Sequence, residues 1–295
     1  MITLTSASEK RLLNTTSVNL LDGTPSTRTS GERKTSDVPV IRQLPQSIPV
    51  KGVSRPIEVK FASTESEWEQ AFALAAASYS ARGYESPGAS RLRFTPYLAL
   101  PETVTLVAKH AEQVLATFSI VMDNTLLGLP MEGTYPDEIA SLRRKGRRMF
   151  EATTLADGGL NFREFGQVFL TLIKLSMQYH TRHGGDSYVI AVNPRHRKFY
   201  TKTMGFVPLG PLRSYAAVRN APAEAFLLDN QLLKENAPDT YEQMFGEPLP
   251  QEALTAPKMP RAFIREFSLQ SRQCDREQIE HILDFTDKLG STRRW

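Results

Sequence analysis

Residues 187–206 combine an apolar strand pattern with a capped helix start, and their side chains suit the binding of an anion. Asn193 suits the N-cap position, Pro194 the first helical position and Gly205 the left-handed residue that ends a helix. Three cations accompany the free N–H groups of the helix start: Arg195, Arg197 and Lys198. Because open α/β sheets bind ligands beyond the carboxyl ends of their strands, a phosphate suits this position. A surface connection with solvated charges has the same local pattern, so both interpretations stay open.

A second group of charges lies at residues 143–148, directly before a β-rich run at 149–155. It contains five cations and no acidic residue: Arg143, Arg144, Lys145, Arg147 and Arg148. Such a cluster attracts nucleic acid, anionic lipid or an acidic protein with a phosphopantetheine arm, and it also occurs on solvated surfaces. The net charge is only +4, and the region from Asp229 onward holds twelve acidic and nine basic residues. With no zinc-finger or RNA-binding aromatic motif in the sequence, the cluster favours a carrier protein over nucleic acid.

The strand-helix junction resembles the last βα unit of the GNAT acyltransferase superfamily. The residues that carry this resemblance are Asn193-Pro194, Phe199-Tyr200 and Gly205-Phe206. Four residues separate the last two pairs, one more than in common acetyl-CoA-dependent members. The longer spacing, with Gly128-Leu129-Pro130 and Asn220-Ala221-Pro222-Ala223, resembles the N-acyl amino acid synthases, relatives of the acyl-homoserine-lactone synthases. The resemblance covers residues 55–230 and implies a pantetheine thioester held between two splayed parallel strands.

The same resemblance implies catalytic roles for Glu151 and Tyr200. Related synthases open the corresponding strand with an acid, a small residue, Ser or Thr, and Arg, but here Thr154 stands in the last position. A free amino acid is mainly ammonium at neutral pH, and burial raises the pKa of a carboxylate toward the range of a useful base. Glu151 is therefore the expected base, and Tyr200 the expected acid that protonates the leaving thiolate. The alternatives are a salt bridge from Glu151 to nearby arginines and simple packing of Tyr200, while Arg148 or Arg213 is a candidate to replace the missing arginine.

The segment at residues 156–166 differs from the glycine-rich loop with which ordinary acetyltransferases cradle the CoA pyrophosphate. Its glycines are out of register, and Asp157 would repel a diphosphate. This departure favours an acyl carrier protein, whose phosphopantetheine-linked acyl thioester is the donor substrate, and no separate cofactor is expected. The apolar stripe of the helix expected at 162–183, which begins at Phe162, indicates core packing, with part of it available to wall an acyl-chain tunnel. His180 and His183 lack an accompanying metal-binding motif, so no metal site is expected.

The surrounding patterns indicate an α/β fold, a GNAT-like mixed sheet flanked by helices. Further strands are expected at 57–62, 103–109 and 113–122, and further helices at 67–81, 231–245 and 275–289. Residues 82–101 are interpreted either as a loop near the site or as a surface connection. The predicted organisation is a flexible leader at 1–54, an acyltransferase domain at 55–230 and a helical C-terminal extension at 231–295.

Length and composition agree with one moderate domain plus extensions, since the 295 residues are 40% hydrophobic and include 19 prolines. No apolar run approaches a membrane span and no signal region is recognisable, so a cytoplasmic protein is expected. The lone Cys274 excludes an internal disulfide.

We predict an enzyme that transfers a medium or long fatty acyl chain from an acyl carrier protein to the α-amine of a free amino acid, without nucleic acid as a partner. The open alternatives are another GNAT-fold acyltransferase, making a lactone signal or acylating an exported polymer, and a non-catalytic module that binds acyl carriers or nucleic acid.

Overall fold

One mixed eight-stranded sheet forms the centre of the protein in the computed structural model, which describes residues 45–86, 88 and 90–292. The strands are β1 (Ile48–Pro49), β2 (Glu58–Phe61), β3 (Val104–His110), β4 (Gln113–Met122), β5 (Met149–Asp157), β6 (Ser187–Val192), β7 (Val207–Tyr215) and β8 (Ala221–Asp229). Their order is β1-β2-β3-β4-β5-β6-β8-β7, and β5 and β6 are the parallel pair in an otherwise antiparallel sheet. The sheet confirms the predicted α/β class. Residues 1–44 of the predicted leader lie outside the described residues.

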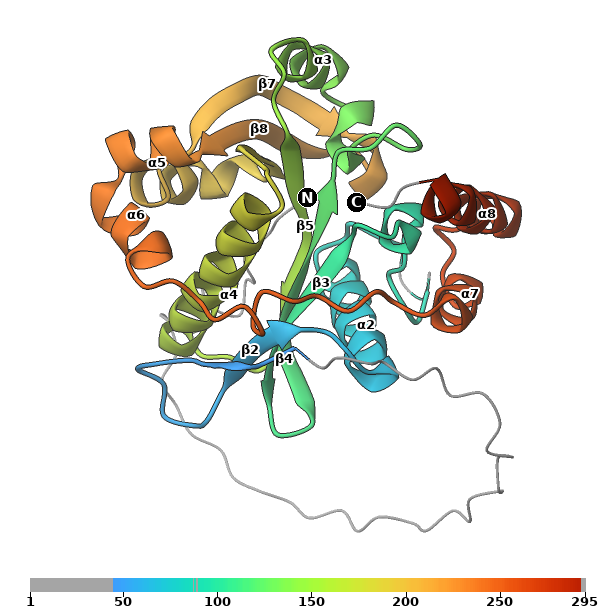
Figure 1. The fold of residues 1–295 in the computed structure, drawn as a ribbon, viewed down its shortest axis with the longest axis horizontal. Helices are drawn as coiled ribbons and strands as arrows, with labels where there is room; N and C mark the ends of the chain where they lie inside the picture. The colour runs from blue at the N-terminus through green and yellow to red at the C-terminus, as the bar shows by residue number, and fades with distance from the viewer. Residues whose placement is uncertain (1–44, 87, 89, 293–295) are drawn as a thin grey trace.

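Helices cover both faces of the sheet (Figure 1). One face carries α4 (Phe162–Arg182), α5 (Asn230–Asn236) and α6 (Pro238–Phe245). The other carries α2 (Glu65–Ala81), α7 (Arg261–Leu269) and α8 (Arg276–Thr292). The remaining elements are α3 (Pro136–Arg144) and five short turns: η1 (Pro96–Ala99), η2 (Pro130–Gly133), η3 (Pro194–His196), η4 (Phe199–Thr203) and η5 (Ala216–Val218).

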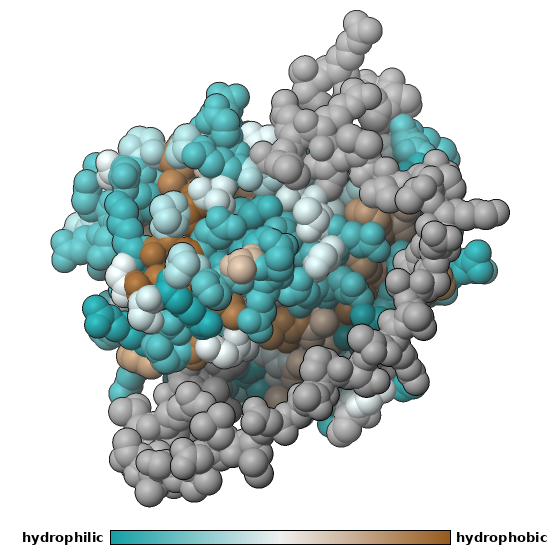
Figure 2. Space-filling view, turned by 90° about the horizontal axis from the view of Figure 1, so that it is seen from below, coloured by the Kyte–Doolittle hydropathy of each residue, from teal (hydrophilic) through white to brown (hydrophobic). Residues whose placement is uncertain are grey.

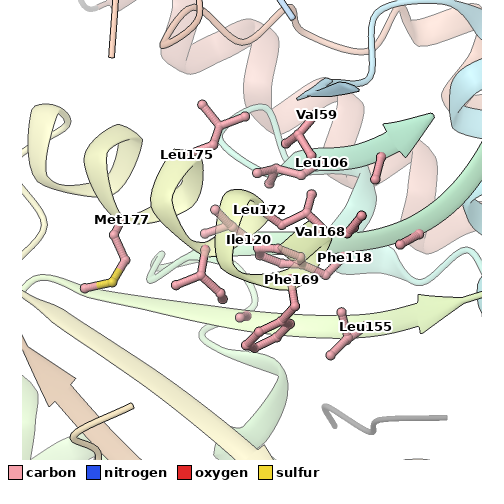
Figure 3. Close-up of a cluster of buried hydrophobic side chains, with 14 of the residues drawn as sticks. Val59, Leu106, Phe118, Ile120, Leu155, Val168, Phe169, Leu172, Leu175 and Met177 are labelled. Atoms are coloured by element: carbon pink, nitrogen blue, oxygen red, sulfur yellow. The ribbon is translucent and has the colours of Figure 1, made fainter. Parts of the chain in front are cut away.

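The apolar stripe of α4 forms the first hydrophobic core, as its spacing predicts. Val168, Phe169 and Leu172 of this helix face Leu106, Phe118, Ile120 and Leu155 of the sheet (Figure 3). Asn161 and Glu164 begin the helix with a capping box, in which each side chain accepts a hydrogen bond from the other residue's backbone N–H. Phe162 was expected in the stripe but is 74% exposed, because it is the first residue of the helix and lies beyond the edge of the core.

Helix α2 anchors the second hydrophobic core on the opposite face. Its N-cap Thr64 accepts a hydrogen bond from the backbone N–H of Glu67, and two acidic residues lie in the first turn. Trp68 and Phe72 are buried against aromatic residues of α7. Helix α2 is thus held between α7 and the strands β4 and β5, which it also contacts.

The segment after β6 is less regular than the predicted capped helix. Asn193 does act as a cap, because its side chain accepts a hydrogen bond from the backbone N–H of Arg195 at 3.2 Å. The chain then forms the 3₁₀ turn η3 and the π turn η4, in which the N–H of Met204 bonds to the carbonyl of Phe199 at 3.3 Å. A π turn accommodates one residue more than an α turn, which accounts for the longer spacing seen in the sequence. Gly205, at φ +73°, ends the segment as predicted.

The helices near the C-terminus differ from their predicted bounds. The helix expected at 231–245 is two helices, α5 and α6, because Pro238 cannot continue the first and starts the second. Asp229 caps α5 by accepting a hydrogen bond from the N–H of Leu232 at 2.7 Å. Helices α3 and α7 were not predicted, since each is short and begins at or next to a proline in a segment that reads as irregular.

Among the described residues, no helix is both long and apolar enough to cross a lipid bilayer. Figure 2 shows one face of the molecule, on which the described surface is mostly hydrophilic and the apolar residues gather in separate small groups.

Candidate active site

The parallel strands β5 and β6 part soon after they begin. Their paired residues are Met149 with Ser187, Phe150 with Tyr188, and Glu151 with Val189. Beyond these pairs, β5 continues on β4 as far as Asp157, and β6 continues on β8 as far as Val192. The facing backbone groups of residues 152–157 and 190–192 are thus not used in pairing β5 with β6. The predicted splay is present, and it can present N–H and carbonyl groups to an extended arm.

A bulge in β5 adds to this separation. The register of β4 against β5 shifts between Thr117 and Ser119, so that β5 carries an extra residue at this point. Thr154 lies there at φ +56°, a conformation that is unusual for a β-branched residue and that bends the strand locally. The position where the related synthases carry arginine is therefore a strained turn of the strand.

Glu151 lies at the point where the two strands part, and it is 0% exposed. Its Oε2 accepts a hydrogen bond from the backbone N–H of Met131 at 2.8 Å, whereas its Oε1 is buried without a hydrogen-bond partner in the structure. Burial raises the pKa of Glu151 to about 7, and the hydrogen bond from Met131 opposes part of this rise. The carboxylate can therefore exchange a proton near neutral pH.

The charge of this carboxylate acts on the phenols of Tyr79, Tyr97 and Tyr215. Burial raises the pKa of each of them and the negative charge of Glu151 adds to the rise, while at Tyr79 the charges of Arg93 and Arg82 oppose it. The guanidinium of Arg93 stacks on the ring of Tyr79 at 3.9 Å from the ring centre. In the described part of the chain Glu151 has no ion-pair partner, so the salt bridge to neighbouring arginines is not formed.

Tyr200 belongs to the other hydrophobic core, on the α4 face of the sheet. Its ring packs edge-on against Phe199 and Phe206, and its hydroxyl is buried without a hydrogen-bond partner in the structure. Burial raises the pKa of Tyr200 further above its ordinary value, so the phenol stays neutral at physiological pH.

Replacement of Tyr200 by phenylalanine tests the predicted acid. If the hydroxyl protonates the leaving thiolate, the variant should release thiol about 10- to 100-fold more slowly at saturating substrates, because general acid catalysis is lost. A thiol-detecting assay at saturating substrates measures this rate. Tyr188→Phe is the matched control, since the Tyr188 hydroxyl already bonds to Ser176 Oγ at 3.0 Å. An unchanged rate for Tyr200→Phe assigns Tyr200 to packing alone.

The five cations at 143–148 lie at the paired end of β5, and two of them are bound to carboxylates. Arg143 donates to Asp123 at 2.6 and 2.8 Å and also to Glu132, while Arg147 pairs with Asp229 at 3.0 Å. These ion pairs raise the pKa of Arg143 further and hold the end of α3. The exposed members of the cluster are Arg144, Lys145 and Arg148.

The second predicted cationic group lies at the opposite, parted end of the strands. Its exposed members are Arg195, Arg197 and Lys198. Asn193 contacts the Tyr84 hydroxyl at 3.4 Å, and Arg197 pairs with Glu224 at 2.6 Å. Since the six residues of β6 span roughly 17 Å at the usual rise per residue, the two cationic groups lie at opposite ends of the parallel pair.

Arg148 and Arg213, the two candidates to replace the missing arginine, are both held away from Glu151. Arg148 is exposed at the paired end, and both terminal nitrogens of Arg213 are held by Glu138 at 2.8 and 2.9 Å. The arginines that share neighbours with Glu151 are instead Arg82 and Arg93, both near Tyr79. Their signal in the sequence was the polar and aromatic segment at 82–101, which was interpreted as a loop near a site or as a surface connection.

Comparison with known proteins identifies the family. A family model described as N-acyl amino acid synthase FeeM matches residues 70–229. The chain belongs to the FeeM family of N-acyl amino acid synthases. This membership confirms the predicted family and makes the protein an N-acyltransferase. A search of curated proteins found no match.

FeeM and two other acyltransferases are among the solved structures to which this FeeM-family chain is similar. FeeM itself, an N-acyl amino acid synthase from uncultured soil microbes, is 25% identical with a TM-score of 0.54, over 62% of this chain and 95% of that chain. The acyl-homoserine-lactone synthase LasI is 15% identical with a TM-score of 0.47, over 70% and 98% of the two chains. An acyl-CoA N-acyltransferase from Pseudomonas aeruginosa is 14% identical with a TM-score of 0.38, over 58% and 97%.

Proposed function

We propose that this FeeM-family enzyme transfers a medium or long fatty acyl chain from an acyl carrier protein to the α-amine of a free amino acid. The observation that carries the proposal is the unpartnered Oε1 of Glu151, buried at the point where β5 and β6 part. A buried carboxylate with a pKa of about 7 is suited to accept a proton from an amine at physiological pH. A group with only a structural role would be expected to have its oxygens satisfied.

The two strands and the two side chains suggest a sequence of steps. The amine nitrogen attacks the thioester carbonyl carbon, and the proton that it must lose passes to Glu151. Backbone N–H groups of the parted strands stabilise the negative oxygen of the tetrahedral intermediate. The C–S bond then breaks, and Tyr200 gives a proton to the departing thiolate. Glu151 and Tyr200 belong to opposite faces of the sheet, which suits an arm that passes between the strands.

The start of α4 supports a carrier protein rather than CoA as donor. A CoA pyrophosphate would need free backbone N–H groups at this helix start, but the N–H of Glu164 is bound by Asn161. The Glu164 carboxylate fills the same place, where it binds the Asn161 N–H and pairs with Arg55 at 3.2 Å. Asp157 adds a further carboxylate at the end of β5. The charge of the exposed cations that follow β6 suits an acidic carrier and its single phosphate.

Mass spectrometry of lipid extracts tests the function directly. Cells that express the protein should accumulate a new amide-linked fatty acid, whose fragmentation identifies both the amino acid and the acyl chain. The matched control is the Glu151→Gln variant expressed at the same level. No new lipid despite confirmed expression and available donors would contradict the proposal, and an ester or lactone product would favour one of the alternative acyltransferase activities.

A purified reaction then separates the two donors. The same acyl chain is offered on acyl carrier protein and on CoA, and the value of kcat/KM is compared. We expect the carrier-bound donor to be preferred, and its kcat/KM to fall as salt rises because charge attraction is screened. Equal use of both donors would remove the carrier-protein part of the proposal while leaving acyl transfer intact.

A further inference from the structure

Arg82 directly follows the last residue of α2. Its guanidinium has hydrogen-bond partners at one terminal nitrogen and none on the edge formed by the other two nitrogens. Nη1 donates to the carbonyl of Ser78 at 2.8 Å and also to Ser78 Oγ. Nε and Nη2 are buried without hydrogen-bond partners in the structure. These two nitrogens lie on the same side of the planar group, where they form a fork that matches the two oxygens of a carboxylate. A buried charged donor without a partner is costly, which suggests that an anion fills this place.

The turn that carries Arg82 lies near the open end of the strands, because the hydroxyl of Tyr84, two residues later, is 3.4 Å from Asn193 Nδ2 directly after β6. Burial lowers the pKa of Arg82, and the charge of Asp157 opposes this. Asp157 is the last residue of β5, and Arg195 follows β6; both interact electrostatically with Arg82. Tyr79 interacts electrostatically with both Arg82 and Glu151. The charges of both groups therefore act on one phenol, which lies in the last turns of α2 three residues before Arg82.

Two buried groups of opposite charge, each with an unfilled hydrogen-bonding position, thus lie near the same tyrosine. Glu151 Oε1 can accept from an ammonium or amine, and the Arg82 fork can donate twice to a carboxylate. We propose that Arg82 binds the α-carboxylate of the acceptor while Glu151 receives the proton of its α-amine. The acceptor class is then a free α-amino acid, in preference to an amine, an amino acid amide or a peptide-internal lysine. This inference rests on the proposed acyl transfer and specifies how its acceptor is recognised.

The other buried arginine of the site is less suited to this role. One terminal nitrogen of Arg93 is bound to Glu85, and the guanidinium stacks on Tyr79. Its Nε is the nitrogen found buried and unpartnered, so it offers one donor where Arg82 offers two. Arg93 is better placed to hold Tyr79 than to bind a carboxylate in two-point fashion.

A phosphate of the donor arm is the competing ligand for the fork. The phosphate would come from the open end, where the exposed cations Arg195 and Lys198 already lie. The two unpartnered nitrogens of Arg82 are buried, and Arg82 shares Tyr79 with the base, which favours the acceptor carboxylate. The two sources predict different kinetic effects.

The test compares each free L-amino acid with its primary carboxamide, using one acyl carrier thioester as donor. The wild-type enzyme should use the best free amino acid at least 100-fold better than its carboxamide in kcat/KM, because the amide leaves the buried fork unfilled. Arg82→Gln should raise the KM for the amino acid about 10- to 100-fold, leave the KM for the donor unchanged and remove most of the discrimination against the carboxamide. Arg82→Lys keeps the charge but loses the two-point geometry. Its KM for the amino acid and its discrimination against the carboxamide should therefore lie between those of the wild type and of Arg82→Gln.

The matched control is Arg91→Gln, an exposed arginine of the same segment that pairs with Glu69. Its kinetic constants should equal those of the wild type, and circular dichroism should show that both variants are folded. A rise in donor KM alone would assign Arg82 to the phosphate, and unchanged constants for Arg82→Gln would remove it from the site. If Arg82→Gln does not fold, the wild-type comparison of the free amino acid with its carboxamide tests the inference by itself. Equal kcat/KM values for the two acceptors overturn the inference. A wild-type enzyme that acylates no amino acid overturns the proposed function itself, an outcome distinct from these.

Discussion

Replacement of Glu151 by glutamine is expected to lower turnover at least 100-fold while leaving the fold intact. The variant keeps the size of the side chain, and its amide oxygen can still accept the hydrogen bond from Met131 that Oε2 accepts now. It cannot take a proton from the attacking amine, and general base catalysis typically contributes 10²- to 10⁴-fold to a rate. Initial rates of thiol release, with product confirmed by mass spectrometry, measure the loss.

The same substitution should make the protein more stable above neutral pH. Burial raises the folded-state pKa of Glu151 from 4.5 to about 7, so the folded protein binds a proton that the unfolded chain releases between these values. Wild-type stability therefore falls as pH rises from about 4.5 to about 7, whereas glutamine carries no charge at any pH. The free energy of unfolding of Glu151→Gln should exceed that of the wild type only slightly near pH 5. The difference should approach about 3 kcal/mol by pH 8, since each pKa unit corresponds to 1.36 kcal/mol.

Urea unfolding at pH 5 and pH 8 measures this difference. Glu58→Gln, on β2 three strands away from β5, is the matched control and should change neither turnover nor the pH dependence of stability. The wild-type kcat/KM should rise with pH through about 7 as Glu151 loses its proton. An active Glu151→Gln enzyme would exclude the base role, and a variant with the same stability as the wild type at pH 8 would contradict the buried, unpaired state of the carboxylate.

Removal of the Glu67 carboxylate is expected to lower the free energy of unfolding by about 3 to 5 kcal/mol, because it breaks a buried ion network. Glu67 is 4% exposed and accepts hydrogen bonds from Lys60 Nζ at 2.9 Å, Lys109 Nζ at 3.1 Å and the N–H of Ser63 at 2.9 Å. Glu67→Ala would leave both lysines, about 10% exposed, without their shared buried partner. Helix α2 also carries Tyr79 and precedes Arg82. Loss of the ion network should therefore make the acceptor site less ordered as well.

The contribution of Glu67 should depend on pH in the opposite sense to that of Glu151. Burial acts to raise the pKa of Glu67, but hydrogen bonds from Lys60, Ser63 and Lys109 outweigh it, and the net pKa is lowered below 4.5. The stabilisation is therefore present above about pH 4.5 and is lost as pH falls through the folded-state pKa. In urea unfolding at pH 7, the free energy of unfolding of Glu67→Ala should lie well below that of the wild type. This difference should become smaller in acid.

Glu69→Ala is the matched control for this prediction. It lies two residues further along α2 and pairs with Arg91, whose side chain is 70% exposed. Its loss should cost no more than about 1 kcal/mol, as for other exposed pairs. Equal losses for Glu67→Ala and Glu69→Ala would show that the buried network contributes little.

Local elements of the protein could be predicted from residue patterns alone. Alternating and continuous apolar runs predicted the strands β3, β4 and β5 to within two residues, and the 3.6-residue period predicted α4. Asn193 and Gly205 took the roles predicted for them, because capping and positive φ depend on the residue and its nearest neighbours. Helices α3 and α7 escaped prediction because they are short and their stability comes from packing rather than from periodicity.

Long-range packing sets the electrostatics of the site. Glu151 is bonded to Met131 and interacts electrostatically with tyrosines from α2, η1 and β7, none of them adjacent to it in sequence. The cations at 143–148 lie beside Glu151 in sequence but at the closed end of the strands, whereas Arg82, about seventy residues earlier in the chain, shares a neighbour with it. Strand direction and long-range packing set these positions, and burial set by distant residues, rather than residue type, determines the pKa of a carboxylate.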